Sequence, residues 1–252
     1  MRALRILLIV TIVLGGLFVI ADRVAVGFAE DEAAERLRAN EGLAATPDVS
    51  IKGFPFLTQV AGGELDEVEV GIKNYEADTS AGTGDASDGA PAKIRIDNLT
   101  AHMRGVAFSS GYSSAKAASA TGTATISYAE LLKAAKAEPV DVTSGVTAQV
   151  VGLSDGGNGK IKVEVEATVL GRKLPRPVSV LSTVRVKGDT VEVQADSLPN
   201  LGVQLAEDKV RLITDFQQKI DGLPGGIRLD RVEAAADGVD IGVKGSDVDL
   251  VG

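Results

Sequence analysis

The chain has 252 residues, enough for one domain behind a membrane-targeting segment, and its 44% of hydrophobic residues can form a sizeable core. Cysteine is absent, which excludes a disulfide-stapled scaffold, thiolate metal sites and cysteine nucleophiles. The net charge is −9, and −11 without residues 1–23, so the chain lacks the basic excess that nucleic-acid binding needs.

The N-terminus has the pattern of a membrane-spanning segment. Arg2 and Arg5 precede an apolar run from Ile6 to Ala21, in which Thr11 is the only polar residue. As a helix, this run is about 24 Å long, somewhat shorter than a hydrocarbon core of about 30 Å. Basic residues before the run and acidic residues after it predict a cytoplasmic N-terminus and an extracytoplasmic remainder.

The segment could be a retained anchor or a cleaved signal peptide, and export follows from either. A signal peptide needs small residues soon after the apolar run, and the nearest match, Gly27–Ala29, comes too late. Leu4 and Val24–Val26 can extend the helix to a full span. We therefore predict a retained anchor at 1–23 and a single domain at 24–252.

Hydrophobic periodicity predicts an α+β domain in which antiparallel strands predominate. The alternation changes phase at Gly53, which is typical of a β-bulge, and Phe54 and Phe56 then continue the strand. Small residues predict loops at 78–92 and 109–119. Helices are predicted at 24–40, 128–137 and 205–221. Strands are predicted at 49–51, 68–72, 94–106, 123–127, 146–150, 161–169, 178–186, 191–195, 227–232 and 239–243.

Few residues suggest catalysis. His102 is the only histidine, so a serine hydrolase triad would have to use it, but its neighbours alternate as in a strand and no Gly-x-Ser-x-Gly elbow is present. Ser113–Lys116 matches Ser-x-x-Lys, yet the companion motifs of penicillin-binding enzymes are missing. We therefore predict no catalytic residue, no metal site and no cofactor.

The segment Gly53–Val60 stands out because it holds two of the six phenylalanines within four residues. An edge strand with a proline and a core aromatic pair explains it adequately. The alternative is an apolar lip where the chains of a ligand enter.

Gly-Phe-Pro-Phe-Leu-Thr-Gln at 53–59, together with Gly-x-Leu-x-x-Val-x-Val at 63–70, resembles the actinobacterial LmeA-like phospholipid-binding family. Leu-Pro-Gly-Gly-Ile-Arg-Leu at 223–229 and Asp-Gly-Val at 237–239 fit the ending of the same family. The resemblance implies an elongated fold of curved antiparallel sheets and amphipathic helices, like tubular lipid-binding (TULIP or BPI-type) proteins, with a tunnel for acyl chains. It implies phospholipid as the partner, with an anionic phosphoinositide-type lipid as one candidate.

We predict that a wall of apolar side chains contacts the lipid. Its candidate residues are Phe54, Phe56, Leu57, Leu131, Leu132, Leu205, Leu212, Ile213, Phe216 and Ile220. The predicted function is binding or shuttling of phospholipid at the outer face of the membrane, in support of envelope glycolipid assembly or homeostasis. The alternative is a structural or protein-interaction domain with a solid core, and valine-rich strands are compatible with both.

Overall fold

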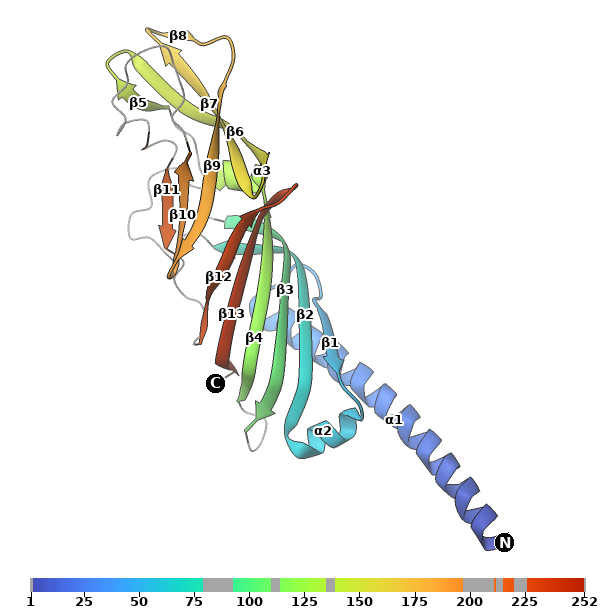
Figure 1. The fold of residues 1–252 in the computed structure, drawn as a ribbon. Helices are drawn as coiled ribbons and strands as arrows, with labels where there is room; N and C mark the ends of the chain where they lie inside the picture. The colour runs from blue at the N-terminus through green and yellow to red at the C-terminus, as the bar shows by residue number, and fades with distance from the viewer. Residues whose placement is uncertain are drawn as a thin grey trace.

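One long helix, α1 (Arg2–Glu41), leads into the fold. The computed structural model describes residues 2–78, 93–109, 114–134, 139–196, 211, 215–219 and 226–251. Residues 2–21 are all exposed, and this half of α1 is long and apolar enough to cross a membrane. From Asp22 onward, one side of α1 is buried against the domain. The helix predicted at 24–40 is confirmed, and it continues the apolar segment without a break (Figure 1).

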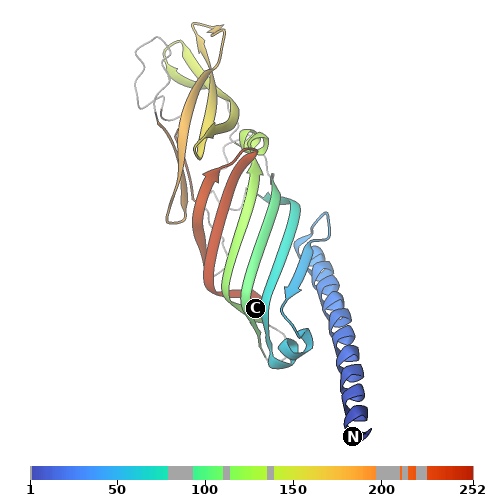
Figure 2. The same cartoon turned by 45° about the vertical axis from the view of Figure 1, so that its right-hand side comes forward.

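The larger part of the fold is a curled, six-stranded antiparallel sheet, which we name sheet A. Its spatial order is β1-β2-β3-β4-β13-β12, so the C-terminal hairpin pairs with a strand from the first half of the chain. Figures 1 and 2 show α1 beside the β1 edge of the sheet. The strands are β1 (Asp48–Lys52), β2 (Glu64–Asp78), β3 (Lys93–Phe108), β4 (Ala115–Ser127), β12 (Ile227–Ala234) and β13 (Gly238–Val251).

A second antiparallel sheet, sheet B, extends the molecule away from α1 (Figure 2). The short helix α3 (Tyr128–Ala134) follows β4 and leads toward sheet B. The helix was predicted at 128–137, and its residues 135–137 lie outside the described residues. The order is β11-β10-β9-β7-β6-β5, and β8 pairs with β7. The strands are β5 (Val140–Thr143), β6 (Val146–Gly157), β7 (Lys160–Val169), β8 (Arg172–Lys173), β9 (Val178–Lys187), β10 (Thr190–Ala195) and β11 (Phe216–Lys219). The prediction of elongated, antiparallel α+β architecture is confirmed.

Strand β4 corrects the prediction of a loop at 109–119. It begins at Ala115, where the sequence is rich in Ala, Ser, Thr and Gly. Such residues have weak intrinsic strand preference, but β4 is paired on both sides, by β3 and β13, so tertiary hydrogen bonds decide its conformation. Its small side chains leave room on the face that they occupy: Ala117 and Ala120 are buried there.

Strand β11 corrects the C-terminal part of the helix predicted at 205–221. Phe216–Lys219 pair antiparallel with β10, in the register Phe216 to Val193. The backbone N–H of Asp215 donates to the Arg211 carbonyl oxygen at 2.8 Å, a helical contact just before the strand. The free edge of β10 offers backbone partners that outweigh the local helical periodicity. Residues 205–210, 212–214 and 220–221 lie outside the described residues.

Two separate hydrophobic clusters hold these layers together. The lower cluster joins α1 and α2 (Phe56–Gly62) to sheet A, through Val26, Phe56, Leu65, Val106, Ala117, Ala120 and Val248. The upper cluster joins sheet A to sheet B, through Tyr128, Val142, Val146, Ala148, Ile161, Val163, Val165, Val232 and Val239. The inner face of sheet A lies between these two clusters, and residues there that belong to neither cluster could contact a ligand.

Paired carboxylates predict the response of the fold to acid. The side-chain hydrogen bond from Lys160, and then that from Thr183, lower the pKa of Asp196, while Lys133 lowers the pKa of Glu130 and Lys244 that of Asp230. A group whose pKa is lower in the folded than in the unfolded state stabilises the folded state at pH values above its unfolded pKa, which is near 4. This contribution is lost as the pH falls through the pKa of the folded state. We expect a melting temperature that is steady from about pH 7 to 5 and decreases below about pH 4.

This pH dependence can be measured by circular dichroism melting of the full chain. Asp196→Asn removes one of the titrating groups, so its melting temperature should start lower at neutral pH and decrease less on acidification. An unchanged wild-type melting temperature between pH 5 and 2.5 would contradict the assignment of these pairs.

Candidate functional site

The strand register places a continuous apolar surface on one face of sheet A. Val70 on β2 pairs with Ala101 on β3, which pairs with Gly122 on β4, which pairs with Val243 on β13. Two residues along, Ile72, Leu99, Ala124 and Ile241 form a parallel row. Because side chains two residues apart along a strand point to the same face, both rows lie on the inner side.

The opposite face of the same strands is polar. Glu69, His102, Thr121 and Lys244 are in register across four strands, and the row beside them contains Thr100, whose hydroxyl is 2.6 Å from that of Thr123. Sheet A therefore has one apolar and one water-facing side, as expected for an antiparallel sheet that covers something on one face.

The middle of the inner face is incompletely covered. Six of its residues are partly exposed and belong to neither hydrophobic cluster of the described residues. We name them the inner apolar strip: Val70, Ile72, Leu99, Ala101, Ala124 and Val243. At its centre Gly122 has no side chain, and a Cβ there would lie 2.9 Å from the Val243 methyl carbon Cγ2. The strip is apolar and partly exposed, which suits contact with a hydrocarbon chain.

The segment Gly53–Val60 forms a turn and a helix, so the predicted strand through Phe54 and Phe56 is wrong. Gly53 has a φ of +94°, the Phe54–Pro55 peptide bond is cis, and α2 begins directly afterwards at Phe56. A Cβ at Gly53 would lie 2.5 Å from the Asp66 Oδ2 atom, so the turn also requires close approach. Strand β1 ends at Lys52, and Pro55 is the N-cap of α2, with a φ of −77°. The two phenylalanines therefore diverge: Phe56 is buried and Phe54 is 57% exposed.

The predicted contact residues are not brought together among the described residues. Phe56 and Leu57 lie in the lower cluster, while Leu131 packs on the upper cluster and Leu132 is partly buried beside it on α3. Phe216 lies on strand β11 of sheet B. Leu205, Leu212, Ile213 and Ile220 lie outside the described residues. The sequence-based prediction did not include the residues of the inner apolar strip, although its valine, leucine and isoleucine residues belong to the alternating pattern of the predicted strands.

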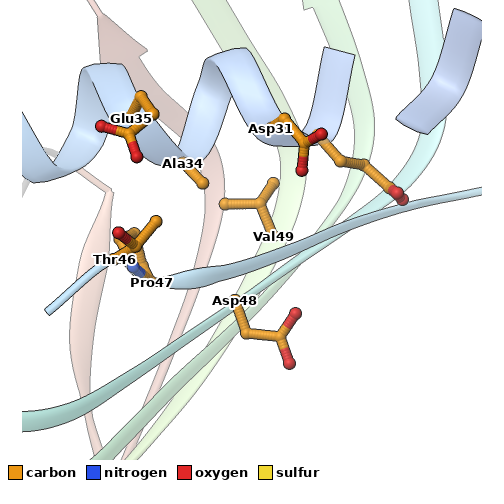
Figure 3. A pocket seen from close by; sticks show the side chains of 8 residues that line it. Asp31, Ala34, Glu35, Thr46, Pro47, Asp48 and Val49 are labelled. Atoms are coloured by element: carbon orange, nitrogen blue, oxygen red, sulfur yellow. The ribbon is translucent and has the colours of Figure 1, made fainter. Parts of the chain in front are cut away.

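Two pockets among the described residues are polar. One, of about 330 Å³, lies between α1 and β1 (Figure 3); its rim carries the carboxylates of Glu30, Asp31, Glu35 and Asp48, and Ala34 faces Val49 inside it. Glu30 Oε1 accepts the Ile51 N–H at 2.7 Å. The other, of about 320 Å³, lies on the polar face of sheet A beside His102. Neither of these pockets is the acyl-chain tunnel that the resemblance implies.

His102 lies on strand β3, as its alternating neighbours predict. Its Nε2 atom is 3.9 Å from Glu69 Oε1, which exceeds hydrogen-bond distance, and its side chain is 42% exposed. Catalytic triads hold their histidine with a short bond to a buried carboxylate, and this pair has neither feature. The described residues contain no group of three or more His, Asp or Glu side chains placed to hold a metal ion.

Of three comparisons with known proteins, the one with family profiles gave a match. Neither the curated proteins nor the solved structures gave a match to this chain. A sequence profile described as LmeA-like phospholipid-binding matches residues 20–243, which covers α1 from its last apolar turn to β13. The chain thus belongs to the LmeA-like phospholipid-binding family.

Proposed function

We propose that this protein binds phospholipid without chemical turnover and shuttles it at the extracytoplasmic face of the membrane. The observation that carries the proposal is the inner apolar strip, which leaves hydrocarbon-like surface partly open in the centre of a curled sheet. Each buried methylene contributes about 0.8 kcal/mol, so a strip that contacts most of an acyl chain stabilises a complex strongly. Membership of a phospholipid-binding family supports the same ligand class.

The proposed location follows from α1. We propose that residues 1–23 stay attached as an anchor and that residues 24–252 form the lipid-binding domain. Arg2 and Arg5 at one end of the apolar run, and an acidic segment at the other, support a cytoplasmic N-terminus. On the outer face, bound phospholipid would serve the assembly or homeostasis of envelope glycolipids.

We infer that the polar head group lies away from the pocket between α1 and β1. An anionic phosphoinositide-type lipid is one candidate ligand, but the four carboxylates of that pocket would repel its phosphates. A comparison of zwitterionic, singly anionic and phosphoinositide lipids in one assay separates these ligands.

Photo-crosslinking tests the proposal on the full chain in lipid nanodiscs. The probe is a phosphatidylcholine with a diazirine on one acyl chain, and labelled peptides are mapped by mass spectrometry. We expect label on the spanning part of α1, which serves as an internal standard, and also on the strip residues of β2, β3, β4 and β13. Label confined to α1 and its immediate surroundings would overturn the proposal and favour an interaction domain with no lipid ligand.

A pair of matched variants sharpens this test. Ala101→Phe fills the inner apolar strip with a larger apolar group and should remove most of the label from the strip. Thr121→Phe places the same side chain on the opposite face of the neighbouring strand and should leave the label unchanged. Equal loss in both variants, with normal circular dichroism, would show that the label does not report on the strip.

A further inference from the structure

Segment 53–57 is fastened to α1 at the point where the apolar run ends. The Asp22 side chain is fully buried, and its Oδ1 atom accepts the Leu57 N–H at 2.8 Å. Arg23 reaches back to Asp22 Oδ2 at 2.5 Å, and its guanidinium carbon lies 5.2 Å from the centre of the Phe54 ring. These contacts fix the height of Phe54, meaning its position along the axis of α1, at the level of Asp22 and Arg23. These two residues directly follow Ala21.

That height coincides with the membrane surface. The segment from Leu4 to Ala21, in which Arg5 is the only charged residue, is about 27 Å long as a helix, so its ends lie close to the two boundaries of a hydrocarbon core of about 30 Å. A ring at the level of Arg23 is therefore close to the interfacial layer, where the aromatic residues Trp and Tyr are enriched. Its 57% exposure means that the ring is available for contact with lipid.

Segment 53–63 itself carries no charged residue, although the domain is acidic. Its charged neighbours are Arg23, against the Phe54 ring, and Asp66, beside Gly53. Residues 105–109, at the end of β3, also carry no charge. The two segments are adjacent: the Phe108 N–H donates to the Gly63 carbonyl oxygen at 2.9 Å. In Figure 1, α2 and the end of β3 lie at the same end of sheet A, beside the emerging helix. These two segments can approach a bilayer without desolvating ions of their own, unlike most of a domain of net charge −11.

We propose that this end of sheet A, formed by segments 53–63 and 105–109, is a bilayer-docking surface in which the Phe54 ring lies among the lipid head groups. The domain is then held upright on the membrane by two contacts, α1 and the Phe54 turn, and does not swing freely on one helix. The partner is the lipid surface in which α1 itself is embedded. The docking surface is independent of the inner apolar strip, so it holds whether or not a lipid binds there.

The absence of tryptophan gives a clean test. Phe54→Trp, in the full chain reconstituted in phosphatidylcholine vesicles, introduces a single tryptophan, which can be excited selectively at about 295 nm. We expect its emission to be blue-shifted and quenched by phosphatidylcholine brominated on the acyl chains near the head group. Leu170→Trp is the matched control, because Leu170 is 83% exposed at the β7–β8 turn, at the far end of the molecule in Figure 1. Its emission should be that of tryptophan in water and should not respond to brominated lipid.

Ala61→Trp, at an exposed position of α2, provides a second reporter on the docking surface should the Phe54 variant fail to fold. Quenching at position 54 or 61, without quenching at 170, supports the proposal. No quenching at 54 and 61 in folded protein would overturn it, and so would equal quenching at all three positions. Photo-crosslinking of the inner apolar strip is a separate measurement, so failure of either idea can be recognised without the other.

Discussion

Tyr128→Ala is expected to lower the free energy of unfolding by about 3–5 kcal/mol, the cost of truncating a large aromatic side chain in a core. Tyr128 is 8% exposed and lies in the upper cluster, between the valines of sheet A and those of sheet B. Its hydroxyl donates to the Ala235 carbonyl oxygen at 2.8 Å. Burial, with Asp155 and Asp240 nearby, also raises the pKa of this tyrosine, so it stays a neutral donor at physiological pH.

Denaturant titration followed by circular dichroism measures this change. Tyr128→Phe is the matched variant: it keeps the ring and removes only the hydrogen bond, so it should cost about 1 kcal/mol. Because Tyr128 joins the two sheets, the alanine variant can also separate one unfolding transition into two. A loss below about 1 kcal/mol for Tyr128→Ala would show that the sheets do not depend on this contact.

Gly238→Ala is the second substitution with a large expected effect, at the upper end of the roughly 1–3 kcal/mol range for overpacking. A Cβ at Gly238 would lie 2.2 Å from the Ile126 carbonyl oxygen and 2.9 Å from the Ser127 Cα atom. Both are backbone atoms of β4, so no side-chain rotation relieves the clash. The first pair of the β13–β4 ladder, Gly238 to Ser127, must separate.

The matched control is Gly62→Ala, at the end of α2, where a Cβ would meet no atom within 4 Å. Alanine in a helix should be neutral or should stabilise by about 0.5–1 kcal/mol. The two variants add the same methyl group, so the difference in their melting temperatures reports the clash together with the smaller helix stabilisation at position 62. Equal melting temperatures would mean that β13 and β4 are not paired at this end.

Much of the β framework could be predicted because its signal is local. Ile161, Val163 and Val165 alternate with charged residues, and they are buried on strand β7 as the alternation indicates. The helix face of Val26, Ala29, Ala33 and Leu37 is likewise the buried or partly buried side of α1. In both cases a residue and its near neighbours in sequence carry the whole pattern, so no knowledge of the fold is needed.

The candidate site could be predicted only in part, because it depends on registers between distant strands. Val70, Ala101 and Val243 form one row of the inner apolar strip, yet they come from three strands separated by long connections. The sequence indicates that each is on an apolar face, but not that the row is left partly open between two clusters. Phe54 and Phe56 were singled out correctly as unusual and assigned wrongly to a strand.

The sequence by itself determined the anchor helix, the alternating strands, the absence of thiol chemistry and the family, since each follows from composition or from contiguous motifs. Only the tertiary structure decided that small residues at 115–122 form a central strand, that 216–219 pair as a strand and that 53–57 turn back onto α1. These segments have weak or misleading local preferences, and hydrogen bonds to partners far along the chain outweigh them.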